Sequence, residues 1–441
     1  MTRPRPRRRV AVTGLGLVTP TGNDVAQTWE ALLVGRSAVA PISRFNASGF
    51  TTRIAAEVRD FEPREWVDDR KLLKMANRSH GFALAAAEQA IADAGIRPQD
   101  DTATRWACVV GTGMMGVSFD ELKSVHKHSV TDGQLDPRRL LDDPIARDPM
   151  MFCRSQSTAG MALLMRRFGI RGNGTSVHTA CASGGQAVGA AMKLIRRGGA
   201  DFALAGGFDS MLNPLGLSGF CLLSALSTDN DTPLRASRPF DLTRNGFVLG
   251  EGAGMLVLEE WQAARLRGAR VYAELAGDGN SLSSYRITDS PPNGDGPIQA
   301  MRQALRDAGA RLEEVDYINA HGTSTPMNDR SEAAAIKGVF AERTSQIPVS
   351  STKSSMGHLI AAAGAVEAAV CALAIQSSEL PVNANFEQTD PNCEQLRLVL
   401  GGSHKGRVRI AISNSLGFGG SNSTLVLRNP DDVDGLAEGP S

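Results

Sequence analysis

The chain has 441 residues, and its 47 Lys and Arg side chains balance 47 Asp and Glu, so its formal net charge at pH 7 is zero. A hydrophobic content of 42% with 21% charged residues excludes a disordered or tail-like protein, and folding a chain of this length buries roughly three quarters of its surface. The missing basic surplus and the aromatic content of only 5% argue against nucleic-acid binding, which needs cations for phosphates.

Cysteine placement and apolar runs bear on the cellular location. The cysteines stand far apart and form no Cys-x-x-Cys pair, which disfavours a zinc site and a small disulfide scaffold. The most apolar run, 359–373, carries Glu367 and is too short to span a bilayer. The arginines before residue 10 precede a segment that Gly14, Gly16 and Pro20 interrupt, unlike the apolar core of a signal peptide. We expect a cytoplasmic protein without a membrane span, whose basic N-terminal tip is frayed.

Short apolar runs alternate with helical patterns along the chain, as in an α/β fold. In the first half the patterns predict strands at 9–16, 106–111, 201–206 and 253–258. They predict helices at 28–34, 77–95 and 183–197, and Gly95 is placed to end the second of these as a left-handed cap. Residues 115–155, with several Asp-Pro steps, are predicted to be an insertion of loops and short helices.

The second half of the chain replays this order. Residues 316–323 resemble 107–113 as a strand that enters a glycine turn, and 349–353 resemble 176–181 as a strand that leads into a helix. The glycine-led strand at 420–428 likewise repeats that at 252–259. We interpret the chain as a tandem α/β duplication with an N-terminal half at 1–265, a C-terminal half at 266–430 and an acidic, disordered tail at 431–441.

The first chemical motif is Val-His-Thr-Ala-Cys181-Ala-Ser-Gly-Gly, a strand that enters a turn and then a helix. A thiol at this junction lies beside unpaired backbone N–H groups and the positive end of the helix dipole, which favour its thiolate. The same N–H groups can bind a developing oxyanion. A buried cysteine that acts as a small hydrophobic residue explains this motif equally well when it is taken alone.

Two further motifs contain histidine. In Asn-Ala-His321-Gly-Thr-Ser-Thr the histidine ends an apolar strand, where a hydrogen-bonded structural histidine is the commoner explanation. In Lys353-Ser-Ser-Met-Gly-His358 a lysine leads into a nearly uncharged helix, where its burial without a partner would be costly. A lysine that caps a helix or forms a salt bridge at a surface turn is the alternative.

The fourth motif, Asn-Ser-Leu-Gly-Phe418-Gly-Gly-Ser-Asn, places three glycines around one phenylalanine. Glycine permits unusual backbone angles and close approach to a ligand, although a turn without a catalytic role has the same composition. No glycine motif matches a phosphate-binding loop, because Gly14-Leu-Gly16 lacks the third glycine and Gly113-Met-Met-Gly116 is followed by no lysine. These glycines are predicted to serve turns and packing.

Together the four motifs resemble those of the β-ketoacyl-[acyl-carrier-protein] synthases of the thiolase superfamily, in particular the elongating type with a Cys-His-His set. The resemblance covers residues 8–428, with each motif in the family's order and spacing. Initiating relatives have Asn where His358 stands, thiolases have a second Cys where Phe418 stands, and chain-length factors lack the cysteine at 181. The resemblance implies a thiolase-like, five-layered α/β/α/β/α fold and a homodimer.

The resemblance also implies a division of chemical roles. Cys181 would take an acyl chain from a carrier-protein thioester, and the backbone N–H groups of Cys181 and Phe418 would form the oxyanion hole. His321 and His358 would bind the carbonyl oxygen of a malonyl-carrier-protein thioester as it loses CO₂. The implied reaction is a decarboxylative Claisen condensation that gives a 3-oxoacyl-carrier protein in fatty-acid or polyketide elongation.

Supporting residues follow from the same resemblance. The Lys353 cation would keep both imidazoles neutral, and Glu332 would be the partner of that lysine. Thr323 and Thr325 would hold the phosphopantetheine arm, which the carrier protein supplies, so no dissociable organic cofactor and no catalytic metal is expected. Phe418 also matches the family's gate residue.

Two assignments rest on weaker matches. Met114 matches the position that limits the acyl pocket, although a methionine that only fills the core is an equal alternative. Asn319, Glu367 and Ser413 match a monovalent-cation site of some relatives. Glu367 needs a partner in its apolar helix, which a plain hydrogen bond could supply.

Residues that depart from the family pattern bear on the partner. Lys71 and Lys74 fit a basic face for an acidic acyl-carrier protein, whereas Leu73, Ser224 and Arg286 replace residues that are common in relatives. A specialised polyketide or aryl-polyene ketosynthase is therefore an alternative to an enzyme of fatty-acid synthesis. A non-catalytic scaffold like a chain-length factor and a Cys-His hydrolase are the alternatives from other functional classes.

Overall fold

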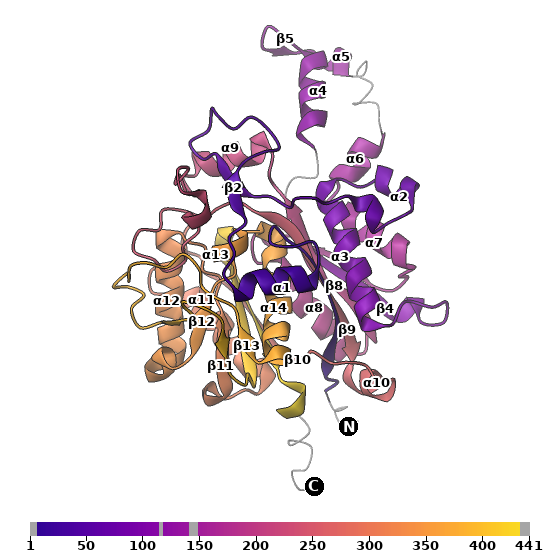
Figure 1. Ribbon diagram of the computed structural model, residues 1–441. Helices are drawn as coiled ribbons and strands as arrows, with labels where there is room; N and C mark the ends of the chain where they lie inside the picture. Colours follow the sequence, from indigo (N-terminus) through magenta and orange to yellow (C-terminus); the bar gives the residue numbers. More distant parts are fainter. Residues whose placement is uncertain (1–6, 114–117, 141–148, 433–441) are drawn as a thin grey trace.

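The fold is built on a sheet that runs through both halves of the chain (Figure 1). The computed structural model describes residues 7–113, 118–140 and 149–432. Within these ranges the sheet has eleven strands in the order β14-β12-β11-β16-β17-β10-β1-β9-β8-β4-β7. The strands of the first half are β1 (Val10–Val18), β4 (Trp106–Thr112), β7 (Gly174–Val177), β8 (Phe202–Ser210) and β9 (Glu251–Glu260). Those of the second half are β10 (Ala273–Leu282), β11 (Val315–Asn319), β12 (Pro348–Ser350), β14 (Arg397–Leu398), β16 (Ile410–Leu416) and β17 (Ser421–Arg428).

Both halves of the sheet have the same topology. The second half carries one extra strand, β14, at the edge of the sheet; without it, each half places its first, fifth, fourth, second and third strand side by side, outward from the central pair β1 and β10. In each half the fifth strand is antiparallel to the first and fourth, while the outer three are parallel. The halves join where Ala11 and Val12 pair with Glu274 and Ala273. This repeat confirms the predicted duplication.

Two helices lie between the halves of the sheet. Helix α8 (Ser183–Arg196) contacts β4 and β8 on one side and β10 and β17 on the other, and α14 (Ala363–Ser377) contacts β8, β9, β16 and β17. Helices α3 (Arg78–Ala94) and α7 (Ala159–Phe168) cover the outer face of the first half. Helices α11 (Asp295–Ala308) and α12 (Pro326–Phe340) cover that of the second half. The five layers are those of the expected thiolase-like fold.

Helix α14 is buried on every side from Ala363 to Ile375, which explains why this stretch is apolar except for Glu367. The window Ile360–Ser377 is long and apolar enough to cross a membrane, but 89% of it is buried inside the protein. A helix that packs against four strands of its own sheet occupies the position of a core helix. It also carries Glu367 into the centre of the molecule.

Helix ends follow from capping residues in the sequence. Helix α3 begins after Asn77, whose side chain accepts the His80 N–H at 2.9 Å, and it ends at Gly95, which has φ 63°. The predicted left-handed cap at Gly95 is therefore confirmed. The predicted helix at 28–34 corresponds to α1 (Val25–Leu33).

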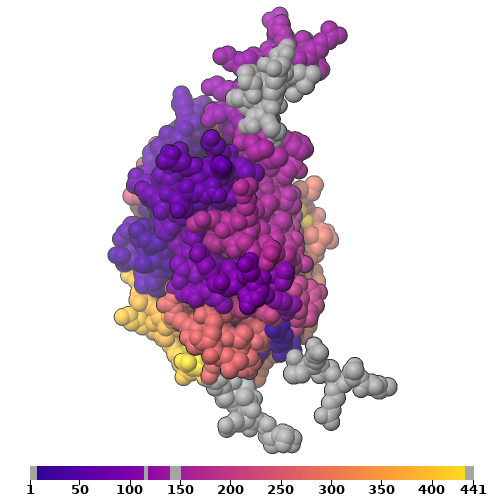
Figure 2. Space-filling view, turned by 90° about the vertical axis from the view of Figure 1, so that its right-hand side faces the viewer, coloured from indigo at the N-terminus to yellow at the C-terminus, as the bar shows by residue number. Residues whose placement is uncertain are grey.

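The described part of the predicted insertion contains the elements α4 (Phe119–Ser129), β5 (Val130–Thr131), β6 (Gln134–Leu135), α5 (Pro137–Leu140) and α6 (Pro149–Ser155). The part that contains α4, β5 and α5 projects from the body of the molecule (Figure 1 and Figure 2), whereas α6 contacts α7. The other short elements are β2 (Val39–Pro41), β3 (Ile54–Ala56), α2 (Arg70–Lys74), α9 (Pro214–Leu222), α10 (Trp261–Leu266), α13 (Lys353–Met356), β13 (Glu379–Leu380) and β15 (His404–Lys405).

The two ends of the described chain are held by specific contacts. Arg8 forms an ion pair with Asp201 at 2.6 Å, and the guanidinium of Arg9 pairs with Glu274 at 2.8 Å. The expectation of a frayed basic tip is therefore wrong for these two residues, because carboxylates of the folded core bind them. At the other end Pro430–Asp432 form a 3-10 turn, and the rest of the predicted tail lies outside the described residues.

Glycines in β1 allow the strand to pack tightly on α3. A Cβ atom at Gly16 would lie 1.8 Å from the carbonyl oxygen of Ala86, and one at Gly14 would lie 2.2 Å from that of Ala90. Any side chain at either position would push α3 away from the sheet. These glycines therefore serve packing, as predicted.

Candidate active site

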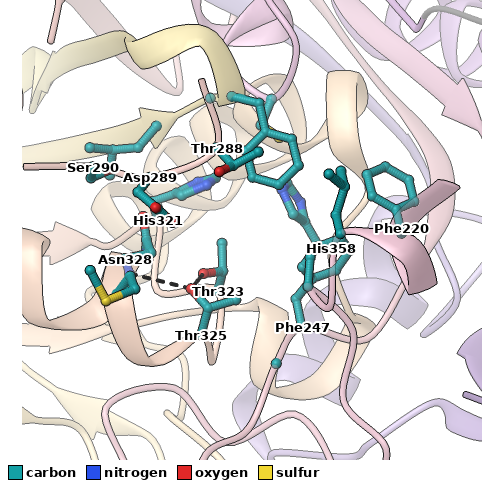
Figure 3. Close-up of a pocket in the computed structure, with 18 of the residues that line it drawn as sticks. Phe220, Phe247, Thr288, Asp289, Ser290, His321, Thr323, Thr325, Asn328 and His358 are labelled. Carbon is teal, nitrogen blue, oxygen red and sulfur yellow. Dashed lines mark hydrogen bonds between the residues drawn. The ribbon is translucent and has the colours of Figure 1, made fainter. Parts of the chain in front are cut away.

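The four sequence motifs meet at one cavity of about 330 Å³ (Figure 3). Its lining includes Cys181 from the first half and His321, His358 and Phe418 from the second. Each of these residues follows the carboxyl end of a parallel strand, either directly or after a short segment. Ligands commonly bind at this position in α/β folds. Met114 lies outside the described residues.

Cys181 lies on a sharp turn between β7 and α8. Ala180 just before it has φ 50°, a left-handed conformation that costs a non-glycine residue roughly 1–3 kcal/mol. Hydrogen bonds hold the turn: the Thr179 N–H donates to Ser183 Oγ at 2.9 Å, and that hydroxyl donates to the Ala180 carbonyl at 2.6 Å. The turn places Cys181 on the cavity wall, with only 7% of the residue exposed.

The electrostatic setting of the thiol differs from the expectation. Burial raises the pKa of Cys181 to about 12, whereas the Lys353 cation and the backbone N–H groups of Phe418 and Cys181 act in the opposite direction. The predicted preference for the thiolate is therefore wrong for the free protein, because desolvation outweighs the groups that favour the charge. Because hydrogen bonds from the backbone N–H groups of Phe418 and Cys181 lower this pKa, both donors lie close to the sulfur.

The two imidazoles lie beside each other on the cavity wall. Their ring centroids are 5.1 Å apart, and the rings are nearly perpendicular, at 84°. The Ile360 N–H donates to His358 Nδ1 at 3.2 Å, so the proton of a neutral His358 ring sits on Nε2. This buried Nε2 has no hydrogen-bond partner within the described part of the chain. The His358 Nε2–H group can thus donate a hydrogen bond to an acceptor in the cavity.

Both imidazoles are neutral at pH 7. Burial lowers the pKa of His321 and of His358 well below the usual value, and the Lys353 cation lowers both pKa values further. Each ring also lies in a tightly packed setting, with 1% of His321 and 2% of His358 exposed. A neutral imidazole carries one N–H group, so each ring can donate one hydrogen bond to an oxygen.

The partner of Lys353 is Glu367, not Glu332 as the resemblance implied. The Lys353 ammonium forms a fully buried ion pair with Glu367 from α14. Glu332 instead accepts the backbone N–H groups of His321 and Gly322, each at 2.8 Å. The correction has a geometric cause, because α12 aims Glu332 at the backbone of the histidine turn.

The residues of the expected cation site lie together in the core. Asn319 on β11 is in register with Ser413 on β16, and both are buried. Among the described residues, Asn319 Oδ1 and Glu367 Oε2 are buried oxygens without a hydrogen-bond partner. Amide and carboxylate oxygens suit a hard cation, so these atoms fit such an ion chemically. The cation itself stays a prediction.

The predicted threonines lie on the wall near the two histidines. The hydroxyls of Thr323 and Thr325 are 2.9 Å apart, and Thr325 also caps α12 by accepting the Asn328 N–H at 3.3 Å. All three residues line the cavity (Figure 3). The pair therefore presents hydroxyl groups to any chain that enters there.

Several cavity residues carry no signal in the sequence. Phe220 and Phe247 pack edge to face at 5.4 Å, and Phe247 contacts the ring of His358 at 5.3 Å. Thr288 and Ser290 line the cavity from the loop before α11. Each of these residues comes from a segment with no recognisable pattern, so only the fold identifies it.

The loop that carries Phe418 is bonded to a second loop. The Gly419 N–H donates to the Ile287 carbonyl at 2.6 Å, and the Ser283 N–H donates to the Gly420 carbonyl at 2.8 Å. Arg286 lies on the outside of this second loop, 3.4 Å from Asp289. The two loops are thus joined to each other by backbone hydrogen bonds at the wall of the cavity.

Comparison with known proteins gives consistent results over both halves. Residues 7–264 match the family described as "Beta-ketoacyl synthase, N-terminal domain", and residues 272–387 match "Beta-ketoacyl synthase, C-terminal domain". The 3-oxoacyl-[acyl-carrier-protein] synthase 2 of Coxiella burnetii is 41% identical over 421 residues, which cover 96% of this chain and 98% of the relative.

Solved structures agree with these sequence matches. The ishigamide ketosynthase/chain length factor superimposes with a TM-score of 0.85 at 36% identity, covering 96% of this chain and 99% of its own. A type II polyketide ketosynthase solved in complex with its acyl-carrier protein has a TM-score of 0.84 at 33% identity, with the same coverage.

The raised pKa of Cys181 predicts how the free enzyme reacts with a small alkylating agent. Since only the thiolate reacts, alkylation of Cys181 by iodoacetamide should accelerate about tenfold per pH unit from pH 7 to 9. Peptide mass spectrometry separates this residue from the exposed Cys153, which serves as the internal reference. A rate that levels off below pH 9 would contradict the buried, protonated thiol.

Proposed function

The chain belongs to the β-ketoacyl synthase family and is an acyltransferase, and from this premise we propose how its site performs the condensation. The reaction joins an acyl chain held on the enzyme to a malonyl-carrier-protein thioester and releases CO₂. The observation that carries the proposal is one cavity in which a cysteine faces two neutral imidazoles. Each half reaction uses a different set of these groups.

Cys181 performs the first half reaction. Its sulfur attacks the carbonyl carbon of an acyl-carrier-protein thioester, and the bond to the pantetheine sulfur breaks. The N–H groups of Cys181 and Phe418 donate to the oxygen that becomes negative in the tetrahedral intermediate. The proton of the thiol leaves with the pantetheine thiol, so the step needs no net acid or base. A raised pKa for the free thiol makes the group unreactive until a thioester enters.

His321 and His358 act in the second half reaction. A malonyl thioester oxygen accepts hydrogen bonds from both imidazoles, and the carbon–carbon bond to the carboxylate breaks with release of CO₂. The resulting enolate carbon attacks the acyl carbonyl on Cys181, and the carbon–sulfur bond breaks. The sulfur then takes one proton, which restores the thiol. The hydrogen bonds from the two neutral imidazoles become stronger as negative charge develops on this oxygen.

Lys353 and Glu332 support the histidines in different ways. The buried Lys353 cation keeps the rings neutral, and its own charge is balanced by Glu367. Glu332 fixes the backbone of the turn at His321 by accepting two N–H groups. We assign Glu332 a positioning role, since it touches the turn and not the cavity.

Phe418 and the threonines control the entrance. We propose that the ring of Phe418 moves as a gate together with the second loop to which its own loop is bonded. The hydroxyls of Thr323 and Thr325 would accept and donate hydrogen bonds along the pantetheine arm. That arm arrives on the carrier protein, so the chemistry uses no dissociable organic cofactor. A cation held by Asn319 and Glu367 would add positive charge in the core near Lys353.

An acyl-carrier protein is the partner that the surface supports. A groove of about 680 Å³ is lined by Glu62 and by six basic side chains of α2 and its neighbours: Arg44, Arg64, Arg70, Lys71, Lys74 and Arg78. Of these, Arg78 is paired with Glu251. Leu73 lies among them as a half-buried apolar contact. We propose that an acidic carrier docks here through charge and one apolar contact.

Two other interpretations are weaker. A scaffold subunit would need no nucleophile, yet Cys181 and both imidazoles line one cavity, and the charge of the buried Lys353 lowers the pKa of all three groups. A hydrolase would need only one histidine beside its cysteine. The similarity to solved polyketide ketosynthases leaves a specialised polyketide or aryl-polyene role as the alternative to fatty-acid elongation. A cytoplasmic location stays a prediction.

Replacing the nucleophile tests the division of roles. Cys181→Gln should abolish condensation of acyl- and malonyl-carrier proteins, while release of CO₂ from malonyl-carrier protein persists, because both histidines remain. Intact-mass spectrometry of the protein reports acyl transfer, and product analysis distinguishes 3-oxoacyl thioester from free acid. Acyl transfer that survives this change would show that another residue is the nucleophile, and free acid alone would support the hydrolase.

Charge reversal in the groove tests the docking surface. Lys71→Glu with Lys74→Glu should lower kcat/KM for malonyl-carrier protein about tenfold or more, with KM carrying the change, because favourable electrostatic contacts become repulsive. Activity on a pantetheine thioester without protein should stay the same. Lys405→Glu, an exposed lysine on β15, is the matched control. Equal losses on both substrates would place the carrier elsewhere.

The open edge of the sheet supports a homodimer. Strand β7 ends the sheet, and Gly174 and Thr175 on it are exposed. We propose that this edge pairs with the same edge of a second copy, so sedimentation should give about twice the chain mass of 46.7 kDa. Ser176→Lys should shift the protein to the monomer, since each copy would bring a lysine into the paired edge strand. A wild-type protein that stays monomeric at all concentrations would contradict this pairing.

A further inference from the structure

The turn that carries His358 has an unusual backbone. Ile360 adopts φ 49°, in the left-handed region, although its branched side chain disfavours this conformation. It is the Ile360 N–H that donates to His358 Nδ1 and so decides which ring nitrogen carries the proton. Something outside the turn must therefore hold this conformation against its strain.

Asp209 holds the turn from the end of β8. Its Oδ2 accepts the N–H of Ala361, the residue directly after Ile360, at 3.1 Å. The carboxylate is 4% exposed and sits at the start of the 3-10 turn Ile360–Ala362 that leads into α14. Burial raises the pKa of Asp209 to about 7, and the hydrogen bond from the Ala361 N–H acts in the opposite direction. The contact therefore links the histidine turn to a strand of the central sheet.

Space for this carboxylate is provided by a residue of the first half. A Cβ atom at Gly113, just after β4, would lie 2.3 Å from Asp209 Oδ1. Asp209 does not line the active-site cavity, and it borders a separate cavity of about 100 Å³ together with His80 and His178. It therefore makes no contact inside the active-site cavity and acts through the backbone of the turn, while its charge also raises the pKa of Cys181.

We infer that Asp209 is a positioning residue that holds Ile360 in its left-handed conformation through the Ala361 N–H, and thereby keeps His358 in the tautomer that donates from Nε2. The inference rests on the proposed function for its kinetic consequence only. The tautomer itself is a property of the resting protein. Asp209 thus ties the first half of the duplication to a donor carried by the second.

Two variants separate the hydrogen bond from the charge. Asp209→Ala removes the acceptor, whereas Asp209→Asn keeps one oxygen that can accept the Ala361 N–H, replaces the other oxygen by an NH₂ group and removes the charge. The matched control is Asp278→Ala, which removes another buried carboxylate, on β10, whose ion-pair partner is Lys193. Thermal unfolding of all three variants reports the general cost of losing a buried carboxylate.

The direct measurement is the ¹⁵N spectrum of the His358 ring. Asp209→Ala should shift its two nitrogen resonances from the pattern of a single Nε2–H tautomer toward a mixture, while Asp209→Asn and Asp278→Ala keep the wild-type pattern. In a Cys181→Gln background, Asp209→Ala should slow malonyl decarboxylation roughly 10- to 100-fold, as expected for loss of the residue that orients a catalytic histidine. Acyl transfer to Cys181, measured in the single variant, should not fall, because removing the Asp209 charge removes one effect that raises the pKa of Cys181.

The outcomes are separable from those of the proposed function. An unchanged His358 spectrum in Asp209→Ala would overturn the inference. A fall in the decarboxylation rate of Asp278→Ala that equals the fall in Asp209→Ala would overturn it as well. Absence of decarboxylation in the Cys181→Gln protein itself would instead contradict the proposed function. The spectrum would still decide the role of Asp209 in that case.

Discussion

The buried ion pair between Lys353 and Glu367 is the interaction on which the site depends. A lone ammonium in the core would be costly, so the cation persists there because α14 supplies a carboxylate at the same depth. From that position Lys353 lowers the pKa of both histidines and opposes the desolvation of the Cys181 thiolate. A single positive charge thus keeps two hydrogen-bond donors neutral and partly offsets the cost of a buried nucleophile.

The duplication explains how one cavity obtains two kinds of chemistry. The third strand of the first half leads into the turn of Cys181, and the third strand of the second half leads into the turn of Lys353 and His358. Equivalent positions therefore face each other across the molecule, with α8 and α14 side by side between them (Figure 1). The two halves share the scaffold and carry different side chains, so the nucleophile comes from the first half and both imidazole donors come from the second.

Backbone conformation supplies precision at this centre. Ala180 and Ile360 both have left-handed angles, and each lies next to a residue of the site. Neither conformation is favourable by itself, so both depend on contacts with the sheet and helices around them. The packed layers therefore hold the geometry of the site. The loops at Phe418 and Ile287 are hydrogen-bonded to each other at its entrance.

The sequence by itself determined the α/β class, the duplication, most of the core elements and the four motifs, because apolar periodicity, glycine caps and short motifs are local properties of a chain. Only the tertiary structure decided that Glu367 and not Glu332 is the partner of Lys353, since both carboxylates lie on helices and their reach depends on packing. It also decided the direction of the Cys181 pKa, which reversed the expectation, and it brought Asp209 to the turn of His358. Burial and through-space distance are set by the whole fold, so no local pattern encodes them.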